Sequence, residues 1–131
     1  MAGFTPTEGA AMCLEHLLKG SSADRGTNLE LLLFTNTSLT LNTTAATLTE
    51  PTGGGYARVT LSDGSWMFSG GIGTYAPYTF TLSGSDYSAD VYGYAIVSTG
   101  TTPRIVAIEN DPDGAKTLIN GDTYTIPMYL I

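Results

Sequence analysis

Basic residues are scarce in this chain of 131 residues, where five lysines and arginines stand against 12 aspartates and glutamates. The formal net charge is −7. Affinity for nucleic acid depends largely on lysine and arginine side chains that neutralise phosphates. Because the chain has no basic run, we expect neither nucleic acid nor an anionic membrane surface as a partner. Charged residues make up only 13% of the chain, about half the usual share, which disfavours a helical bundle with solvated faces.

Cysteine and long apolar runs are also lacking. The single Cys13 allows no intramolecular disulfide and no zinc site of the Cys-x-x-Cys type. No apolar run approaches the ~18 residues that a membrane helix needs. The opening MAGFTPTEGA has neither the basic region nor the apolar core of a signal peptide. We therefore expect a soluble protein that is synthesised in the cytoplasm.

The N-terminal segment predicts one helix that runs to about Lys19. Thr5 is suited to cap it, Glu8 to complete a capping box, and Gly20 to end it in the left-handed conformation. Small and apolar side chains share one arc of about 160° on the helical wheel, namely Ala10, Ala11, Cys13, Leu14, Leu17 and Leu18. The opposite side carries Met12, Glu15 and His16. We expect the apolar arc to pack onto a sheet.

From residue 28 onward the apolar period changes from 3.6 to 2, which is typical of strands. Seven or eight short strands are expected, over residues 29–35, 38–50, 56–62, 65–69, 78–83, 90–98, 104–109 and 123–131. Two of them, 29–35 and 90–98, are apolar on both faces and are therefore expected in a sheet interior. With no second helix to act as a crossover, the pattern predicts an antiparallel β-sandwich of jelly-roll or Greek-key type.

Turn signals refine this picture of one domain, with an arm and helix over residues 1–20 and a sandwich over residues 28–131. Asp63-Gly64 predicts a hairpin between two of the strands, and Asn120-Gly121 a tight turn before the last one. Pro127 cannot donate to a strand ladder, so the last strand is expected at an edge or with a bulge.

The stretch EPTGGGYARVTL, residues 50–61, resembles a phosphate-binding loop at first sight. A phosphate loop needs a following Gly-Lys-Ser/Thr and a helix whose N-terminus meets the phosphate. Here a strand follows the glycines and no lysine is near. The sequence therefore predicts a turn at Gly53–Gly55 that leads into an interior strand from Tyr56, with Arg58 paired to an acid or stacked on an aromatic ring.

Two further motifs invite a chemical interpretation. Cys13 and His16 lie one helical turn apart, which suggests a catalytic nucleophile and its base. The helical wheel, however, places Cys13 in the apolar arc, where burial makes a thiol inert. The segment Asp111–Gly114 resembles part of a calcium loop, which would need a glutamate where Asn120 stands. It also fits a type I turn, which we favour, and cation binding there stays an open alternative. We expect no catalytic, cofactor-binding or metal site.

Aromatic residues are spread along the expected strands and loops. They are Trp66, Phe68, Tyr75, Tyr78, Tyr87, Tyr92, Tyr94 and Tyr129. Tyrosine and tryptophan are enriched at protein interfaces and in grooves that bind sugars. Ordinary core or rim positions are the simpler interpretation for each of them.

The order of several short phrases is similar to that in a known family. LLKG ends the helix, LELLLFT forms an apolar strand, and EPTGGGYARVTL follows. YAPYTFTL, VYGYAIVS and NGDTYTIP come later in the chain. This order resembles small virion proteins of tailed bacteriophages, known as head decoration (cement), head-fibre or tail-fibre-like proteins. Where the typical relative carries a Trp-Ala-Glu-like phrase, this chain reads IVAIEND.

The resemblance implies a structural role without catalysis, as a capsid decoration protein on the exterior of a phage head. Its partner would be the major capsid protein, with several copies bound, often as trimers. The alternative is a tail or fibre-associated protein that joins fibres or binds a host glycan. Expected docking surfaces are the arm and the Leu/Thr-rich edge segment 38–48, together with exposed aromatics. The candidate interface residues are Ala2, Phe4, Leu39, Leu41, Leu48, Trp66, Tyr75, Tyr78 and Tyr87.

Overall fold

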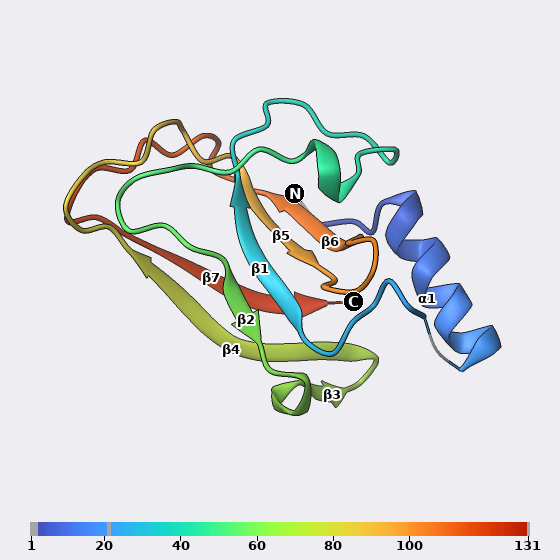
Figure 1. Ribbon diagram of the computed structural model, residues 1–131. Coiled ribbons are helices and arrows are strands. Elements are labelled where there is room, and N and C mark those ends of the chain that lie inside the picture. The colour runs from blue at the N-terminus through green and yellow to red at the C-terminus, as the bar shows by residue number, and fades with distance from the viewer. Residues whose placement is uncertain (1–2, 21, 131) are drawn as a thin grey trace.

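The computed structural model describes residues 3–20 and 22–130, the last two by backbone alone. The elements within these residues are α1 (Thr7–Lys19), β1 (Leu29–Phe34), β2 (Val59–Leu61), β3 (Met67–Ser69), β4 (Ile72–Thr81), β5 (Gly93–Val97), β6 (Ile105–Asn110) and β7 (Thr123–Leu130). They form two antiparallel sheets, with strand orders β2-β1-β5-β6 and β3-β4-β7, and α1 lies at one end beside β6 (Figure 1). The protein is thus mainly β, with the two-sheet layout that fits a β-sandwich.

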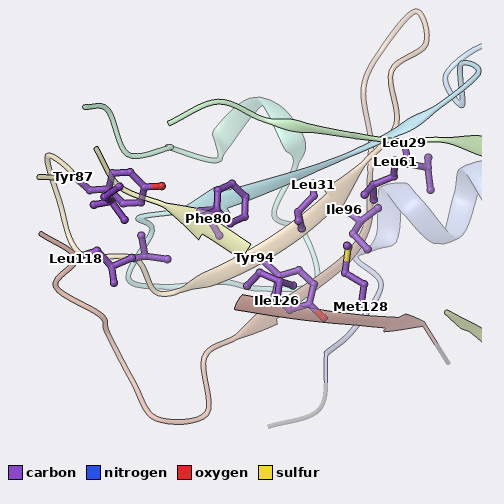
Figure 2. Close-up of a cluster of buried hydrophobic side chains, with 13 residues drawn as sticks. Leu29, Leu31, Leu61, Phe80, Tyr87, Tyr94, Ile96, Leu118, Ile126 and Met128 are labelled. Carbon is purple, nitrogen blue, oxygen red and sulfur yellow. The ribbon is translucent and has the colours of Figure 1, made fainter. Parts of the chain in front are cut away.

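The four-stranded sheet is buried on both faces. On one face, Leu31 and Ile96 point toward Phe80 and Ile126 of the other sheet and form the main core (Figure 2). On the opposite face, a second cluster consists of Leu32, Phe34, Ala95, Val97, Ile105 and Ile108. Each of the larger side chains, from Leu, Ile, Val or Phe, contributes about 1.5–3 kcal/mol when fully buried. This double burial explains why β1 and β5 are apolar throughout, and it confirms their predicted interior positions.

The segment that covers the second cluster differs from the prediction. Residues 38–48 form a loop with a short 3₁₀ turn at Ala45–Thr47 instead of edge strands. Hydrogen bonds of the Asn36 side chain take the place of the expected strand pairing. Its carbonyl oxygen accepts the Thr49 amide at 2.8 Å, and its amide group donates to the Thr47 carbonyl at 3.0 Å. Polar side chains of this kind compete with strand pairing. The prediction of an edge strand in this segment was therefore wrong.

The glycine-rich middle of the chain also departs from expectation. The strand expected from Tyr56 is shorter and lies at the sheet edge, as β2, instead of in the interior. Asp63–Ser65 forms a 3₁₀ turn between two different sheets, so the predicted hairpin there was wrong. The hairpin instead joins β3 to β4 through Gly70-Gly71, with φ of 60° and 79°. Glycine at both positions of a two-residue loop accommodates these positive φ values without strain.

The prediction for Pro127 is confirmed. Strand β7 lies at the edge of its sheet, and its register with β4 shifts between Tyr75 and Tyr78. At that point Ala76 and Pro77 stand opposite Pro127. Neither proline has an amide to donate, so a bulge is the natural place for both.

Helix α1 ends as predicted but begins differently. Gly20 adopts a left-handed φ of 78° at its C-terminus. Pro6 occupies the N-cap position, and no side chain caps the first turn, so the predicted capping box was wrong. The Glu8 carboxylate instead accepts the amides of Ala45 and Ile105, each at 2.8 Å. One acidic side chain thereby ties the helix to both the loop and strand β6.

The helix contacts β6 through the side that carries Gly9. A Cβ atom at Gly9 would stand 1.9 Å from the Ile105 carbonyl oxygen, so the two backbones are in close contact. Gly9 and Met12 are the buried residues of α1. The expectation that the apolar arc packs onto the sheet was therefore wrong, because the opposite side does so.

This contact yields a test by substitution. Gly9→Ala should lower the free energy of unfolding by about 2–3 kcal/mol, because the added methyl group displaces α1 from β6. Gly64→Ala is the matched control, since its Cβ would meet nothing within 4 Å, and it should change stability by less than about 0.5 kcal/mol. Urea denaturation measures both. Equal stability of the two variants would contradict the close contact.

Candidate interaction surfaces

The side of α1 that faces away from β6 carries exposed leucines. Leu14, Leu17 and Leu18 are 57%, 77% and 75% exposed. Their smaller neighbours on the same side are exposed too. The apolar helix face is defined here as Ala10, Ala11, Cys13, Leu14, Leu17 and Leu18. Contiguous apolar patches of this kind are characteristic of interaction sites, so this face is a candidate one.

An open groove of about 370 Å³ continues this face along one side of the helix. Asp24 and Arg104 line it from one side, and the α1 side carries both apolar and charged residues, namely Ala11, Met12, Leu14, Glu15, Leu18 and Lys19. Arg104 Nη2 and Asp24 Oδ2 are 3.0 Å apart, which holds the far wall in place. The apolar helix face is therefore extended by a depression that other side chains can enter.

A second apolar surface lies at the β3–β4 hairpin. Met67 and Phe68 are 72% and 80% exposed, and we refer to these two residues as the hairpin tip. Phe68 pairs with Gly73 across the strands, and its ring covers the space where a Cβ would stand. Beside the tip, the Trp66 and Tyr75 rings pack edge to face with centroids 5.1 Å apart. The hairpin tip is thus a protruding apolar edge.

The structure separates the interface residues expected from the sequence. Three of them are half-buried on the second cluster, namely Phe4, Leu39 and Leu48. Trp66 and Tyr75 are half-buried against the main core, and Tyr87 is buried. Two are open to solvent, Leu41 at 61% and Tyr78 at 39% exposure. Ala2 lies outside the described residues.

The arm near Phe4 is part of the fold. Phe4 and Ile108 exchange two backbone hydrogen bonds of 2.9 Å each, which adds a bridge at the edge of β6. Leu41 accepts the Thr7 amide through its carbonyl at 2.8 Å while its side chain stays exposed. The sequence reasoning missed Met67 and the outward direction of the helix leucines. The sequence feature that could have indicated an exposed Met67 is the glycine pair Gly70-Gly71, which forms the turn after β3.

Cys13 and His16 are both exposed, so the predicted burial of Cys13 was wrong. The wheel correctly grouped Cys13 with the leucines of α1, but the whole group faces outward. Within residues 3–20 and 22–130, no three His, Cys, Asp or Glu side chains are grouped so as to hold a metal ion.

The glycine triplet forms a turn packed against a neighbouring loop. Gly53, Gly54 and Gly55 have φ of 81°, 59° and 75°. The Gly54 amide donates to Ser85 Oγ at 2.8 Å, and its carbonyl accepts the Ser83 amide at 3.1 Å. A Cβ on Gly54 would stand 2.8 Å from the Tyr87 ring. The close approach to this loop is what requires glycine here.

A polar network lies beside this turn, centred on Glu50. Arg58 Nη2 is 2.8 Å from Glu50 Oε2, and Arg58 Nη1 is 3.4 Å from Glu30 Oε1. The Tyr56 hydroxyl donates to Glu50 Oε1 at 2.7 Å and accepts the Leu33 amide at 3.1 Å. The expected pairing of Arg58 with an acid is thus present, and the network ties residues 50–58 to strand β1.

The environment shifts the pKa values of this network. Burial raises the pKa of Glu50, but hydrogen bonds from Arg58 and Tyr56 and the charge of Arg58 together bring it below 4.5, its ordinary value. Burial and the hydrogen bond to Glu50 raise the pKa of Tyr56. The hydrogen bond to Glu50 raises the pKa of Arg58, against the effect of burial. The geometry therefore serves stability, with Glu50 ionised at neutral pH.

The segment Asp111–Gly114 forms a hydrogen-bonded turn. Gly114 donates its amide to the Asp111 carbonyl at 3.0 Å, and the Asp113 amide donates to Asp111 Oδ1 at 2.8 Å. The other carboxylate oxygen, Oδ2, accepts the Tyr124 hydroxyl at 2.6 Å. Both oxygens of Asp111 therefore already have donors within the chain.

Comparisons with protein-family models, with curated proteins and with solved structures gave no significant match. In the part of the chain that the structure describes, no helix is long and apolar enough to cross a membrane. The functional interpretation therefore depends on the two apolar surfaces and on the sequence itself.

The Glu50 network yields a pH-dependent test. Because the folded pKa of Glu50 lies below its ordinary 4.5, its stabilisation is present above pH 4.5 and is lost as the pH falls through the folded value. Glu50→Gln should cost about 1–2 kcal/mol at pH 7, and this difference should shrink toward pH 3. Glu15→Gln removes an exposed pair with Lys19 and should cost less than about 0.5 kcal/mol at any pH. Urea unfolding at several pH values measures both, and a Glu50→Gln cost that stays constant with pH would contradict the assignment.

Proposed function

We propose that this protein is a structural component of a tailed bacteriophage virion, bound to the outside of the head as a decoration protein. Its partner is the major capsid protein, and it acts without catalysis or a cofactor. The two sheets are proposed to be connected as in a jelly roll or Greek key. The order of short phrases from LELLLFT to NGDTYTIP supports this assignment through its resemblance to such proteins.

The observation that carries the proposal is the exposure of large apolar side chains on a small folded domain. Leu17, Leu18 and Phe68 are each at least 75% exposed, on two separate elements. Exposed apolar groups on this scale reduce solubility unless a partner covers them. A protein that functions as part of a larger assembly has such partners.

The hairpin tip is the surface that we assign to the capsid. Met67 and Phe68 project from a three-residue edge strand that is followed by the turn Gly70-Gly71. A narrow apolar protrusion fits a hollow between capsid subunits, and its short edge can also extend a partner's sheet. Binding there would hold neighbouring subunits together.

The charge supports a position on the exterior. With a net charge of −7, the protein would be repelled by packaged DNA, whereas proteins that contact DNA carry basic patches. On the outer surface of the head no such contact is needed.

The alternative, a tail or fibre-associated protein that binds a host glycan, has less support. It requires Trp66, Tyr75, Tyr78 and Tyr87 to form stacking platforms. Tyr87 is only 8% exposed, and Trp66 and Tyr75 pack on each other. Among these four, the exposed Tyr78 ring is the one that could stack on a sugar.

Copy number in virions of a phage that encodes this chain tests the proposal. Quantitative gel densitometry should find on the order of hundreds of copies per head, as expected for a protein that follows capsid symmetry. Phe68→Ser should greatly reduce the number of copies bound, because the substitution removes an exposed ring and leaves the core intact. Leu41→Ser, at another exposed site, is the control. Only a few copies, at the tail, would contradict the decoration role.

A further inference from the structure

The apolar helix face is divided by size along the helix. Its N-terminal half carries the small side chains Ala10, Ala11 and Cys13, and its C-terminal half carries Leu14, Leu17 and Leu18. Small side chains allow another helix to approach closely, whereas leucines need a hollow to fill. One half of the face therefore has room for large side chains, and the other half presents large side chains that need such room.

A second copy of the same helix supplies the complement only when it runs antiparallel. A parallel pair would place leucines on leucines at one end and leave a gap over the alanines at the other. In an antiparallel pair, Leu17 of each copy lies over Ala10 of the other, and Cys13 lies opposite Leu14. Large groups then meet small groups at both ends, as close packing requires.

We propose that α1 pairs with α1 of a second copy, antiparallel, about a two-fold axis near Cys13 and Leu14. The same face serves both copies, as in any two-fold contact. This pairing is independent of capsid binding, which we assign to the hairpin tip. It also differs from the trimer that the family resemblance implies.

The charges near the helix agree with this arrangement. The apolar helix face carries no charged residue, so the net charge of −7 is not concentrated at the contact. Glu8 accepts the amides of Ala45 and Ile105 on the other side of α1, and Lys19 pairs with Glu15, so neither charge is needed at the contact. Antiparallel pairing also aligns the two helix dipoles favourably.

Other occupants fit less well. A helix that lies on a membrane surface presents lysine and arginine on its polar face. The polar side of α1 is instead tied to the fold through Glu8, with Lys19 paired to Glu15 at 3.5 Å. A second copy is therefore the partner whose shape and charge match this face.

The size of the face indicates a modest affinity. The three leucines and their small neighbours offer roughly 400 Å² of apolar surface, within the range of functional patches. A standard interface buries about 800 Å² on each partner. The groove beside Leu14 and Leu18 adds to the contact, and the pairing is expected to depend on protein concentration within the micromolar range.

Light scattering over a range of concentrations, with reductant present to exclude disulfides, tests the pairing. The wild-type mass should rise from one chain toward two. Leu17→Glu should weaken association more than about tenfold, because it places two charges in the contact. Leu17 is 77% exposed, so this variant should fold normally. Phe68→Ser, at the hairpin tip, is the matched control and should associate like the wild type.

Several results would overturn the pairing. They are a wild-type monomer at all concentrations up to about a millimolar, a trimer as the only assembly, and association that survives Leu17→Glu. A monomeric wild type whose binding to capsids is abolished by Leu17→Glu would also overturn it and would assign the face to the capsid protein. If Phe68→Ser abolishes capsid binding but leaves the pairing intact, the two surfaces act independently. Failure of the pairing would then leave the proposed function standing.

Cysteine cross-linking tests the antiparallel direction. In the proposed pair the two Cys13 residues lie near the axis, while positions 10 of the two copies are separated by about 10 Å along the helices. A short thiol cross-linker should therefore join wild-type chains through Cys13 more efficiently than chains carrying Ala10→Cys with Cys13→Ser. Equal efficiency at the two positions, or the reverse order, would indicate parallel helices and overturn the proposed geometry.

Discussion

The close contact between the backbone of α1 at Gly9 and the carbonyl of Ile105 determines which way the helix faces. The amides that Glu8 accepts reinforce it, at 2.8 Å each. Since no Cβ fits between Gly9 and β6, the helix can rest on the sheet edge only by this side. The leucines of α1 are therefore turned outward, and both the proposed assembly role and the proposed helix pairing depend on that direction.

The four-stranded sheet has two apolar faces, and both must be covered. The three-stranded sheet covers one face, and the arm at Phe4 with the loop around Leu39 and Leu48 covers the other. Segments that the sequence suggested as docking surfaces are thus used within the fold. Among the described residues, the apolar helix face and the hairpin tip are where exposed apolar side chains are adjacent to one another.

Much of the fold was predictable because β1 and β5 are apolar on both faces and Pro127 restricts β7 to an edge. The 38–48 segment was not, since alternating leucine and threonine suits a strand as well as a loop held by Asn36 side-chain bonds. Among candidate site residues, Leu41 and Tyr78 were found open to solvent. The helix was misread because apolar periodicity shows which residues share a face, but the direction of that face depends on Gly9, whose contact is not visible in the sequence.

Thiol accessibility at Cys13 tests the outward direction of the helix most directly. Ellman's reagent, applied to dilute protein at about 0.1 µM so that copies stay apart, should react with native Cys13 within about tenfold of the rate for the unfolded chain. A native thiol that reacts only as fast as the protein unfolds would show that the apolar face packs inward, and it would contradict the account.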